Sequence, residues 1–505
     1  MSSNNNNQKN HNKKRPNNNK YQGGSRSKKD KKATQTWRRD FKNNGGDDNE
    51  DGKNSTTPHA GSFANPAMRE QFGVVIDEEL LNMSKNKDKD EADTSQTNNG
   101  DDNDNNDTND KKPKKKVAIL LGFLGTNYGG FQVNEGQRTL QAEIELALLR
   151  CGMLSASNFG FPFKYGWSSS ARTDKGVHAA AQVCSCKVEL DENEWNEEHL
   201  EQARRRLNEA LPSDIRVLDM DRVTRKFCAK TQRDRVRYQY MVPAFLLHSD
   251  WKGLLTENNV DMSVTCRDDG GDLKRPINDD AIKKLQQSLE GYRSTDESRK
   301  ALKDALRRYE GTNFYHNFTR GLTPGQAQAQ RYIESFIVQD PIVVENVEWI
   351  PTQVLGQSFL LHQIRKMIGV AVDVARGAVP LSIMDNALSK KHAMVIDVAP
   401  AQGLFLEMSY FGGYNTRKKQ QNQDLNDLDW TRDGPANDRW SAFRDVVRSH
   451  IVQEEREQGN FLQYIYRHEL VFDVRKEYGL DGNISTDATE HVTSNTENEA
   501  SSKDG

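Results

Sequence analysis

Apolar positions along the chain alternate between a strand-like and a helix-like spacing from residue 117 to about residue 410. The run at 117–125 (VAILLGFLG) has the length of a strand, and 139–152 carries apolar residues three and four apart, which predicts a helix. The same reading predicts strands at 181–190, 215–222, 233–243, 331–339, 342–349, 354–361 and 403–410, and helices at 195–210, 279–310 and 362–376. Strands and helices that alternate in two halves predict an α+β fold around a mixed sheet with flanking helices.

Polar stretches divide the chain around this pattern. Residues 1–113 predict a disordered tail, first basic and then acidic, because nine of the first 20 residues are Asn and charge comes in blocks. The two halves of the folded part are expected at 114–243 and 244–415, with a loop insertion near 248–278. Residues 416–438 are interpreted as a linker. Apolar residues at helical spacing then predict a C-terminal helical extension at 439–480, and 481–505 predicts a second disordered tail.

Composition narrows the class of protein. No run of about 18 apolar residues occurs, so we expect no membrane-spanning helix. The polar, Asn-rich start lacks the apolar core of a signal peptide. Five cysteines, none in a C-x-x-C pair, argue against a disulfide framework and a zinc ribbon. We therefore expect no structural metal.

Charge is strongly segregated although the net charge is only −3. Residues 1–43 hold 13 Lys and Arg against 2 Asp, whereas residues 44–110 hold 5 against 17 Asp and Glu. A basic arm beside a mildly basic core favours a polyanionic partner such as nucleic acid. Charged tails that only keep the protein soluble are the alternative.

The segment that carries chemistry is Ser168 to Ala180 (SSSARTDKGVHAA). It places Asp174 on a tight turn just before a predicted strand, with Gly176 free to adopt a backbone conformation that other residues avoid. Arg172 and Lys175 flank the carboxylate and would favour its ionised form. From the residues alone, Asp174 is either a solvated turn residue or a functional carboxylate.

The stretch Ala171-Arg-Thr-Asp-Lys-Gly-Val-His-Ala179 resembles the catalytic motif of the tRNA pseudouridine synthase TruA family, whose pattern is G/A-R-T-D-x-G-V-H-A. Further segments resemble that family in the same order: YGGFQ at 128–132, LPSDI at 211–215, RYQY at 237–240, SFLLHQIRKMIG at 358–369 and GLFL at 403–406. The resemblance covers residues 117–412. His178 and the segment GTNFYHNFT at 311–319 are similar to the eukaryotic tRNA pseudouridine synthase 1-like branch.

The resemblance implies a pseudouridine synthase fold with an RNA cleft between its two halves. It implies an isomerase that flips uridines out of tRNA and converts them to pseudouridine without any cofactor or metal. Asp174 is then the nucleophile, Arg365 its ion-pair partner, and Tyr238 the ring that stacks on the base and assists proton transfer. The point of attack, C1′ or C6 (or removal of a C2′ proton), stays open.

The implied substrate-binding residues are Arg172, Tyr238, Leu404, Lys230 and Arg237. Phosphate contacts are expected along a basic cleft, with 204–206, Lys226, Arg233 and Arg235 as further candidates. The histidines His178, His316 and His362 are interpreted as hydrogen-bonding supports.

The branch resemblance implies several tRNA sites, including positions 27 and 28 of the anticodon stem, with mRNA and other structured RNAs as further substrates. Two alternatives remain: a catalytically inactive RNA-binding protein that aids tRNA folding, and a chromatin- or ribosome-binding protein that acts through its tail. Basic clusters at 13–15, 28–32 and 111–116 resemble nuclear-import signals and favour the nucleus, with mitochondrion or cytoplasm as alternatives. No membrane and no obligate protein partner are expected.

Overall fold

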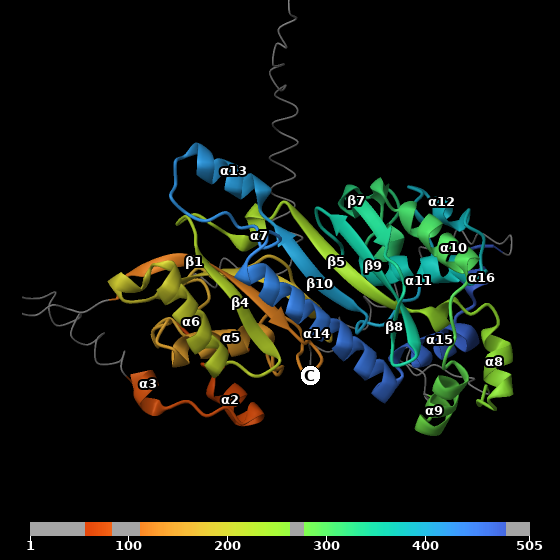
Figure 1. Ribbon diagram of the computed structural model, residues 1–505, viewed down its shortest axis with the longest axis horizontal. Helices are drawn as coiled ribbons and strands as arrows, with labels where there is room; N and C mark the ends of the chain where they lie inside the picture. Colours follow the sequence, from red (N-terminus) through yellow and green to blue (C-terminus); the bar gives the residue numbers. More distant parts are fainter. Residues whose placement is uncertain (1–55, 83–111, 263–276, 481–505) are drawn as a thin grey trace, which may run out of the picture. The chain divides into compact units, whose positions relative to one another are not determined.

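A central sheet organises the part of the chain that the computed structural model describes, residues 56–82, 112–262 and 277–480. Within these residues ten strands form one sheet in the order β4-β1-β3-β10-β5-β9-β7-β6, with β2 paired to β3 and β8 to β9 (Figure 1). The strands are β1 (Lys114–Phe123), β2 (Ser168–Ser169), β3 (His178–Glu189), β4 (Ile215–Arg222), β5 (Arg235–Pro243), β6 (Gly311–Phe314), β7 (Gln330–Val338), β8 (Ile342–Val344), β9 (Val347–Gly356) and β10 (Leu404–Tyr410).

A single parallel contact joins the two halves of this described sheet. β3 and β10 run parallel and pair Phe405 with His178 and Leu406 with Ala179, whereas the other ladders are antiparallel. On one side of this junction lie β1 and β4, and on the other β5, β9, β7 and β6. The predicted mixed sheet in two halves is therefore confirmed, and the residues at the start of β3 lie at its centre.

Fourteen α-helices occur in the described residues, most of them amphipathic. They are α2 (Pro66–Phe72), α3 (Glu78–Asn82), α5 (Leu140–Arg150), α6 (Glu197–Ala210), α7 (Ala229–Gln232), α8 (Trp251–Glu257), α9 (Asp279–Ser288), α10 (Asp296–Arg307), α11 (Gln363–Ala375), α12 (Ile383–Ala387), α13 (Gly412–Gln420), α14 (Pro435–Gln458), α15 (Asn460–Val471) and α16 (Val474–Glu477). None of these helices is long and apolar enough to cross a membrane.

The alternation of side chains along β1 gives the sheet two buried faces. Val117, Ile119 and Leu121 belong to the apolar cluster that includes α5 and α6. Ala118 and Leu120 belong to the cluster that includes α14 and α15, and α14 contacts β1, β3 and β4 (Figure 1). Both faces of β1 are therefore covered, which explains why its sequence is an unbroken apolar run.

The N-terminal segment 56–82 departs from the prediction of disorder up to residue 113. Phe63 is fully buried in the cluster of β1 and α5, and the hydroxyl of Ser62 donates to the buried carboxylate of Glu145 at 2.6 Å. Asn65 caps α2 through the backbone N–H of Ala67. A few buried apolar residues between polar stretches are therefore enough to pack this segment against β1 and α5. The predictions for 1–55, 83–111 and 481–505 lie outside the described residues.

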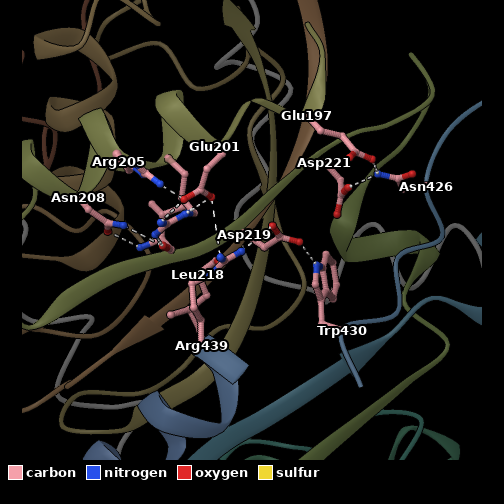
Figure 2. A network of polar contacts seen from close by, with 12 residues as sticks. Glu197, Glu201, Arg205, Asn208, Leu218, Asp219, Asp221, Asn426, Trp430 and Arg439 are labelled. Atoms are coloured by element: carbon pink, nitrogen blue, oxygen red, sulfur yellow. Dashed lines mark hydrogen bonds and ion pairs between the residues drawn. The ribbon is translucent and has the colours of Figure 1, made fainter. Parts of the chain in front are cut away.

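The predicted linker at 416–438 is also wrong, because α13 forms at its start and the rest is held by polar side chains. Trp430 donates to Asp219 on β4 at 2.8 Å, and Asn426 donates to Asp221 at 3.2 Å. Arg439, at the start of α14, donates to Asp219 and to the carbonyl of Leu218 (Figure 2). These hydrogen bonds fix the path of the chain from β10 to α14. The pattern of hydrophobic residues does not predict them, because they are made by polar side chains.

Three smaller expectations are corrected. The insertion near 248–278 contains α8, whose Trp251 is buried, while 263–276 lie outside the described residues. The strand expected at 354–361 is the end of β9, which stops at Gly356. The basic run 111–116 leads into β1, where Lys114 to Lys116 pair with β3, so half of this run belongs to the sheet and not to the tail.

The C-terminal extension is confirmed as helical. Pro435 stands in the first turn of α14, where its missing N–H is not needed. The helix ends at Gly459, whose φ of 61° allows the turn into α15. The buried carboxylate of Glu455 accepts the backbone N–H groups of Phe461 and Leu462, so it caps the second helix.

Candidate active site

The loop that carries Asp174 lies between Ser170 and the start of β3. Ser170 bonds to Ser409 of β10 at 2.9 Å, and the side chain of Gln182 donates to the carbonyl of Ala171 at 2.6 Å. Gly176 has a φ of 77°, which permits the tight turn before Val177. The loop is thus fixed on both sides of Asp174 by the strands at the centre of the sheet.

A second loop, residues 124–139, packs against this one. The backbone N–H of Phe131 donates to the carbonyl of Thr173 at 3.1 Å. A β-carbon on Gly125 would lie 2.2 Å from the carbonyl oxygen of Val177, so only glycine permits this approach. The loop 124–139 therefore packs closely against the Asp174 loop, and this approach requires glycine at position 125.

Asp174 is accessible, and its side chain is 40% exposed. The nearest basic group given by the structure is His362, whose Nε2 lies 4.0 Å from Oδ2 of Asp174. Asp174 also acts electrostatically on Tyr238 and Arg365, which places both side chains in its neighbourhood. Three of the residues predicted for catalysis are thus brought together.

Arg365 is oriented differently from the prediction of a direct ion pair. Its Nε donates to the carbonyl of Ala399 at 2.6 Å, and among the described residues no ion pair within 4 Å joins it to Asp174. Burial lowers the pKa of Arg365, and the charges of Tyr240 and Asp174 partly restore it. The backbone carbonyl of Ala399 therefore holds the guanidinium of Arg365 in the neighbourhood of the Asp174 carboxylate.

Tyr238 stands on β5 beside the catalytic loop. Its ring meets Phe359 edge to face, with centroids 5.6 Å apart. Burial raises the pKa of Tyr238 to about 12, Arg233 opposes the rise, and Asp174 adds to it. The side chain is a neutral phenol at pH 7, which suits stacking on a base.

Arg233 is a positioning residue that the sequence indicated only as a phosphate contact. Its guanidinium donates to the carbonyl of Ser170 at 2.6 Å and to the carbonyl of Gln357 at 3.1 Å. It thereby ties the catalytic loop to the segment between β9 and α11. Burial lowers the pKa of Arg233, and the nearby Tyr238 partly offsets this.

The other predicted binding residues separate into two groups. Arg172 and Lys230 are exposed, and the backbone N–H of Lys230 donates to Ser168. Leu404 is buried at the start of β10, where it pairs with Tyr240. Arg172 lies in the Asp174 loop itself, two residues before the carboxylate.

The structure corrects the prediction that Arg237 binds the substrate. It neighbours Tyr238 on β5 and so points to the opposite face of the sheet. There its Nε lies 2.7 Å from Oε2 of Glu407, and its guanidinium packs over the rings of Tyr410 and Trp440. Glu407 is buried, which makes this an internal ion pair and removes Arg237 from the substrate-binding set.

Behind the catalytic loop lies a polar cluster that the sequence did not predict. His178 is fully buried, and its Nδ1 accepts the backbone N–H of Gly125 at 3.0 Å. Its Nε2 lies 3.6 Å from Oε2 of Glu454 on α14, whose other oxygen accepts from Thr126 at 2.8 Å. His450 completes the cluster by a 2.8 Å bond to Thr126. The extension helix thus reaches the base of the active site.

His178, His450 and Glu454 lie close enough to hold a metal ion. The tautomer of His178 argues against one. Because an amide N–H can only donate, Nδ1 of His178 must be the unprotonated nitrogen, and Nε2 then carries the proton that points to Glu454. A protonated nitrogen cannot ligate a metal, so the cluster is best described as a hydrogen-bonded support.

Comparisons with known proteins bear on this arrangement. A family model described as tRNA pseudouridine synthase matches residues 305–411. The chain is 32% identical over 376 residues to the tRNA pseudouridine(27/28) synthase of Saccharomyces cerevisiae, covering 69% of this chain and 97% of that protein. The chain belongs to the tRNA pseudouridine synthase family. It is an RNA pseudouridine synthase, an isomerase, of the synthase 1-like branch of the TruA family.

Other relatives are also similar to this synthase over more than half of its length. The tRNA pseudouridine synthase 1 of Candida albicans is 31% identical over 379 residues, which cover 63% of this chain and 60% of that protein. The pseudouridylate synthase 1 homolog of Mus musculus is 31% identical over 359 residues, covering 70% and 73%. The resemblance drawn from the motif at 171–179 is confirmed at the level of the family.

Proposed function

We propose that this synthase converts uridines of tRNA to pseudouridine, including positions 27 and 28 of the anticodon stem, with Asp174 as the nucleophile. The observation that carries the proposal is the position of Asp174, half-exposed on a braced loop and within reach of Tyr238, Arg365 and His362. A relative with this core is named for positions 27/28.

The reaction needs the base to leave its stack, the N-glycosidic bond to break and a C–C bond to form. The ring of Tyr238, fixed by Phe359, offers a flat apolar face for the flipped uracil. The carboxylate of Asp174 attacks the substrate and holds it covalently while the base turns. Arg365, held at Ala399, provides a fixed positive charge beside this carboxylate and the negative charge that develops on the base.

The decisive experiment maps pseudouridine in unmodified tRNA incubated with the purified native protein, with Asp174→Asn and with Asp174→Ala. We expect product from the native protein alone, with tRNA affinity retained in both variants. Asp304→Asn, which breaks an exposed ion pair on α10, is the matched control and should stay active. Equal product from native protein and Asp174→Ala would show that another residue is the nucleophile.

The same assay separates the alternative function. A native protein that binds tRNA tightly and forms no pseudouridine would favour an RNA-binding protein that aids tRNA folding. Structured mRNA fragments included as competing substrates test whether the activity extends beyond tRNA. We expect modification of stems that present the target uridine in an A-form helix, because shape rather than base sequence dominates such recognition.

We also propose that the protein acts in the nucleus. The basic clusters at 13–15 and 28–32 support this proposal. The third cluster, 111–116, is left out because half of it forms part of β1. Fluorescence imaging of the full chain, and of a chain with both clusters changed to Gln, tests this. Retention of nuclear signal by the changed chain, or a mitochondrial pattern in the native one, would overturn the proposal.

A further inference from the structure

His362 is held in the left-handed backbone region, which few non-glycine residues adopt and in which Asn, Asp and His are over-represented. Its φ of 61° lies in the left-handed region, at the residue that begins α11, and its side chain makes no capping hydrogen bond. The other non-glycine residues with positive φ in the described chain are Asn259, Glu345, Asn346 and Asn422, mostly of the type that tolerates this region. Such strain costs on the order of 1–3 kcal/mol and is concentrated at functional sites.

The imidazole of His362 lies next to the carboxylate of Asp174. Nε2 of His362 lies 4.0 Å from Oδ2 of Asp174, and the side chain is 19% exposed. Nδ1 is buried and has no hydrogen-bond partner among the described residues. The ring is positioned by the backbone and leaves Nε2 facing the reaction centre.

The charges around His362 favour a neutral ring at pH 7. Burial and the guanidinium of Arg365 lower its pKa, Asp174 raises it in part, and Arg320 and Lys366 lower it further. These groups come from the catalytic loop, from α11 and from the segment after β6. A neutral imidazole can accept a proton, whereas Tyr238 is a phenol that already holds one.

We propose that His362 is a further catalytic residue, whose Nε2 accepts the proton that leaves C5 of the uracil once the new C–C bond has formed. This rests on the proposed function. The C5–H electron pair becomes the C5–C6 double bond, the pair of the C6–N1 double bond moves to N1, and N1 takes up a proton from water. The imidazolium formed lies beside the carboxylate of Asp174 and returns its proton to solvent, so the step is balanced.

The test uses substitutions that fit the strained backbone. Asn and Gly both adopt positive φ, so His362→Asn and His362→Gly remove the base without disturbing the turn. Glu345→Asn is the matched control, because Glu345 has a φ of 49° at the β8–β9 turn, away from the active site. Substrates are tRNA transcripts made with ordinary uridine and with uridine deuterated at C5.

We expect a fall in single-turnover rate of about 100-fold or more in His362→Asn with tRNA affinity unchanged. The slowed variant should show a primary isotope effect with the deuterated tRNA, and imidazole added to His362→Gly should restore the rate. The native rate should rise with pH through a pKa below 6.5, and this limb should be absent in His362→Asn. Glu345→Asn should match the native protein.

Two outcomes overturn the inference and leave the proposed function intact. One is a His362→Asn variant with native rate and native pH profile. The other is a slow variant that shows no isotope effect and no rescue by imidazole, which would mark a structural role. A native protein that forms no pseudouridine at all would instead overturn the proposed function itself.

Discussion

Two buried histidines connect the C-terminal extension to the two halves of the sheet, and they are held in opposite ways. His178, at the catalytic loop, accepts an amide N–H on one nitrogen and faces a single carboxylate, Glu454, at 3.6 Å. His468, on α15, lies between two carboxylates, with Nε2 2.9 Å from Asp373 and Nδ1 3.2 Å from Asp397. The first therefore faces one anion through one nitrogen, whereas the second faces an anion through each of its two nitrogens, which favours the imidazolium form.

The difference shows that neighbouring charged groups, more than burial, determine the protonation state of a histidine. Burial would lower the pKa of His468, but Asp373 and Asp397 raise it to about 9. Burial also opposes ionisation of Asp373, yet His468 and Arg376 hold the pKa of this carboxyl below its ordinary value. The extension is therefore fixed to α11 by a cluster with several charged groups and to the loop before β3 by a longer contact to one carboxylate.

The largest expected effect comes from breaking the ionic cluster at Asp373. Asp373→Asn leaves the buried His468 and Arg376 without their shared anion and weakens the bond from Tyr478. We expect the free energy of unfolding to fall by about 3–5 kcal/mol, measured by urea denaturation. Asp304→Asn, at an exposed pair, should cost under about 0.5 kcal/mol. A similar small loss in Asp373→Asn would mean that the cluster contributes little.

The charge on His468 predicts a pH dependence. Because its folded pKa of about 9 exceeds the ordinary value of 6.5, its stabilisation is complete below pH 6.5 and is lost as pH rises to about 9. The native protein should lose about 2–4 kcal/mol of unfolding free energy over this window through His468.

His468→Gln isolates this contribution. Glu455 and Asp221, whose pKa values burial raises to about 8 and about 7, titrate in the same range in both proteins and cancel in the difference. The difference in unfolding free energy between the two proteins should therefore shrink as pH rises. A difference that stays constant from pH 6 to 9.5 would contradict a charged His468.

The contact between His178 and Glu454 should matter less for stability and more for catalysis. Glu454→Ala leaves Nε2 of buried His178 and the hydroxyl of Thr126 without an acceptor, which should cost about 1–3 kcal/mol. Because His178 stands four residues after Asp174, we expect a lower kcat with an unchanged KM in tRNA kinetics. Glu454→Gln should recover part of the kcat. An unaltered kcat in Glu454→Ala would show that α14 does not orient the loop.

The smallest expected effect is at Thr126. Thr126→Val keeps the shape of the side chain and removes the bonds to His450 and Glu454. We expect a loss of about 0.5–1.5 kcal/mol in unfolding free energy with nearly native activity, as measured by thermal and urea unfolding. A larger loss than in Glu454→Ala would mean that Thr126, not Glu454, anchors the cluster.

Sequence reasoning recovered the parts of the fold that periodic burial determines. The run before Gly125 is continuously apolar, the helix of Arg365 is apolar at helical spacing, and these two elements and the strand of Tyr238 are all predicted near their observed bounds. α13 was missed because its helix is almost entirely polar and is held by contacts such as the pair of Lys418 with Asp427. The folding of segment 56–82 was not predicted, because its few buried apolar residues, such as Phe63 and Met68, lie between two long polar stretches.

The candidate site was predicted in its residues more than in its geometry. Motif matching placed Asp174, Tyr238 and Arg365, which the structure brings into one neighbourhood. It could not show that strand alternation turns Arg237 away to Glu407, or that a positive φ turns His362 toward Asp174. The spacing of residues in a sequence does not reveal contacts between distant segments or the backbone conformation of a single residue.

The parallel junction between β3 and β10 has a consequence for biosynthesis. β1, β3 and β4 can pair as soon as residues up to 222 have been made, because their partners are close in sequence. β10 lies at the centre of the sheet but is among the last strands to leave the ribosome, and it carries the Ser409 hydroxyl that holds Ser170. A nascent chain therefore contains every residue of the 171–179 motif long before β10 is available to hold Ser170 in place.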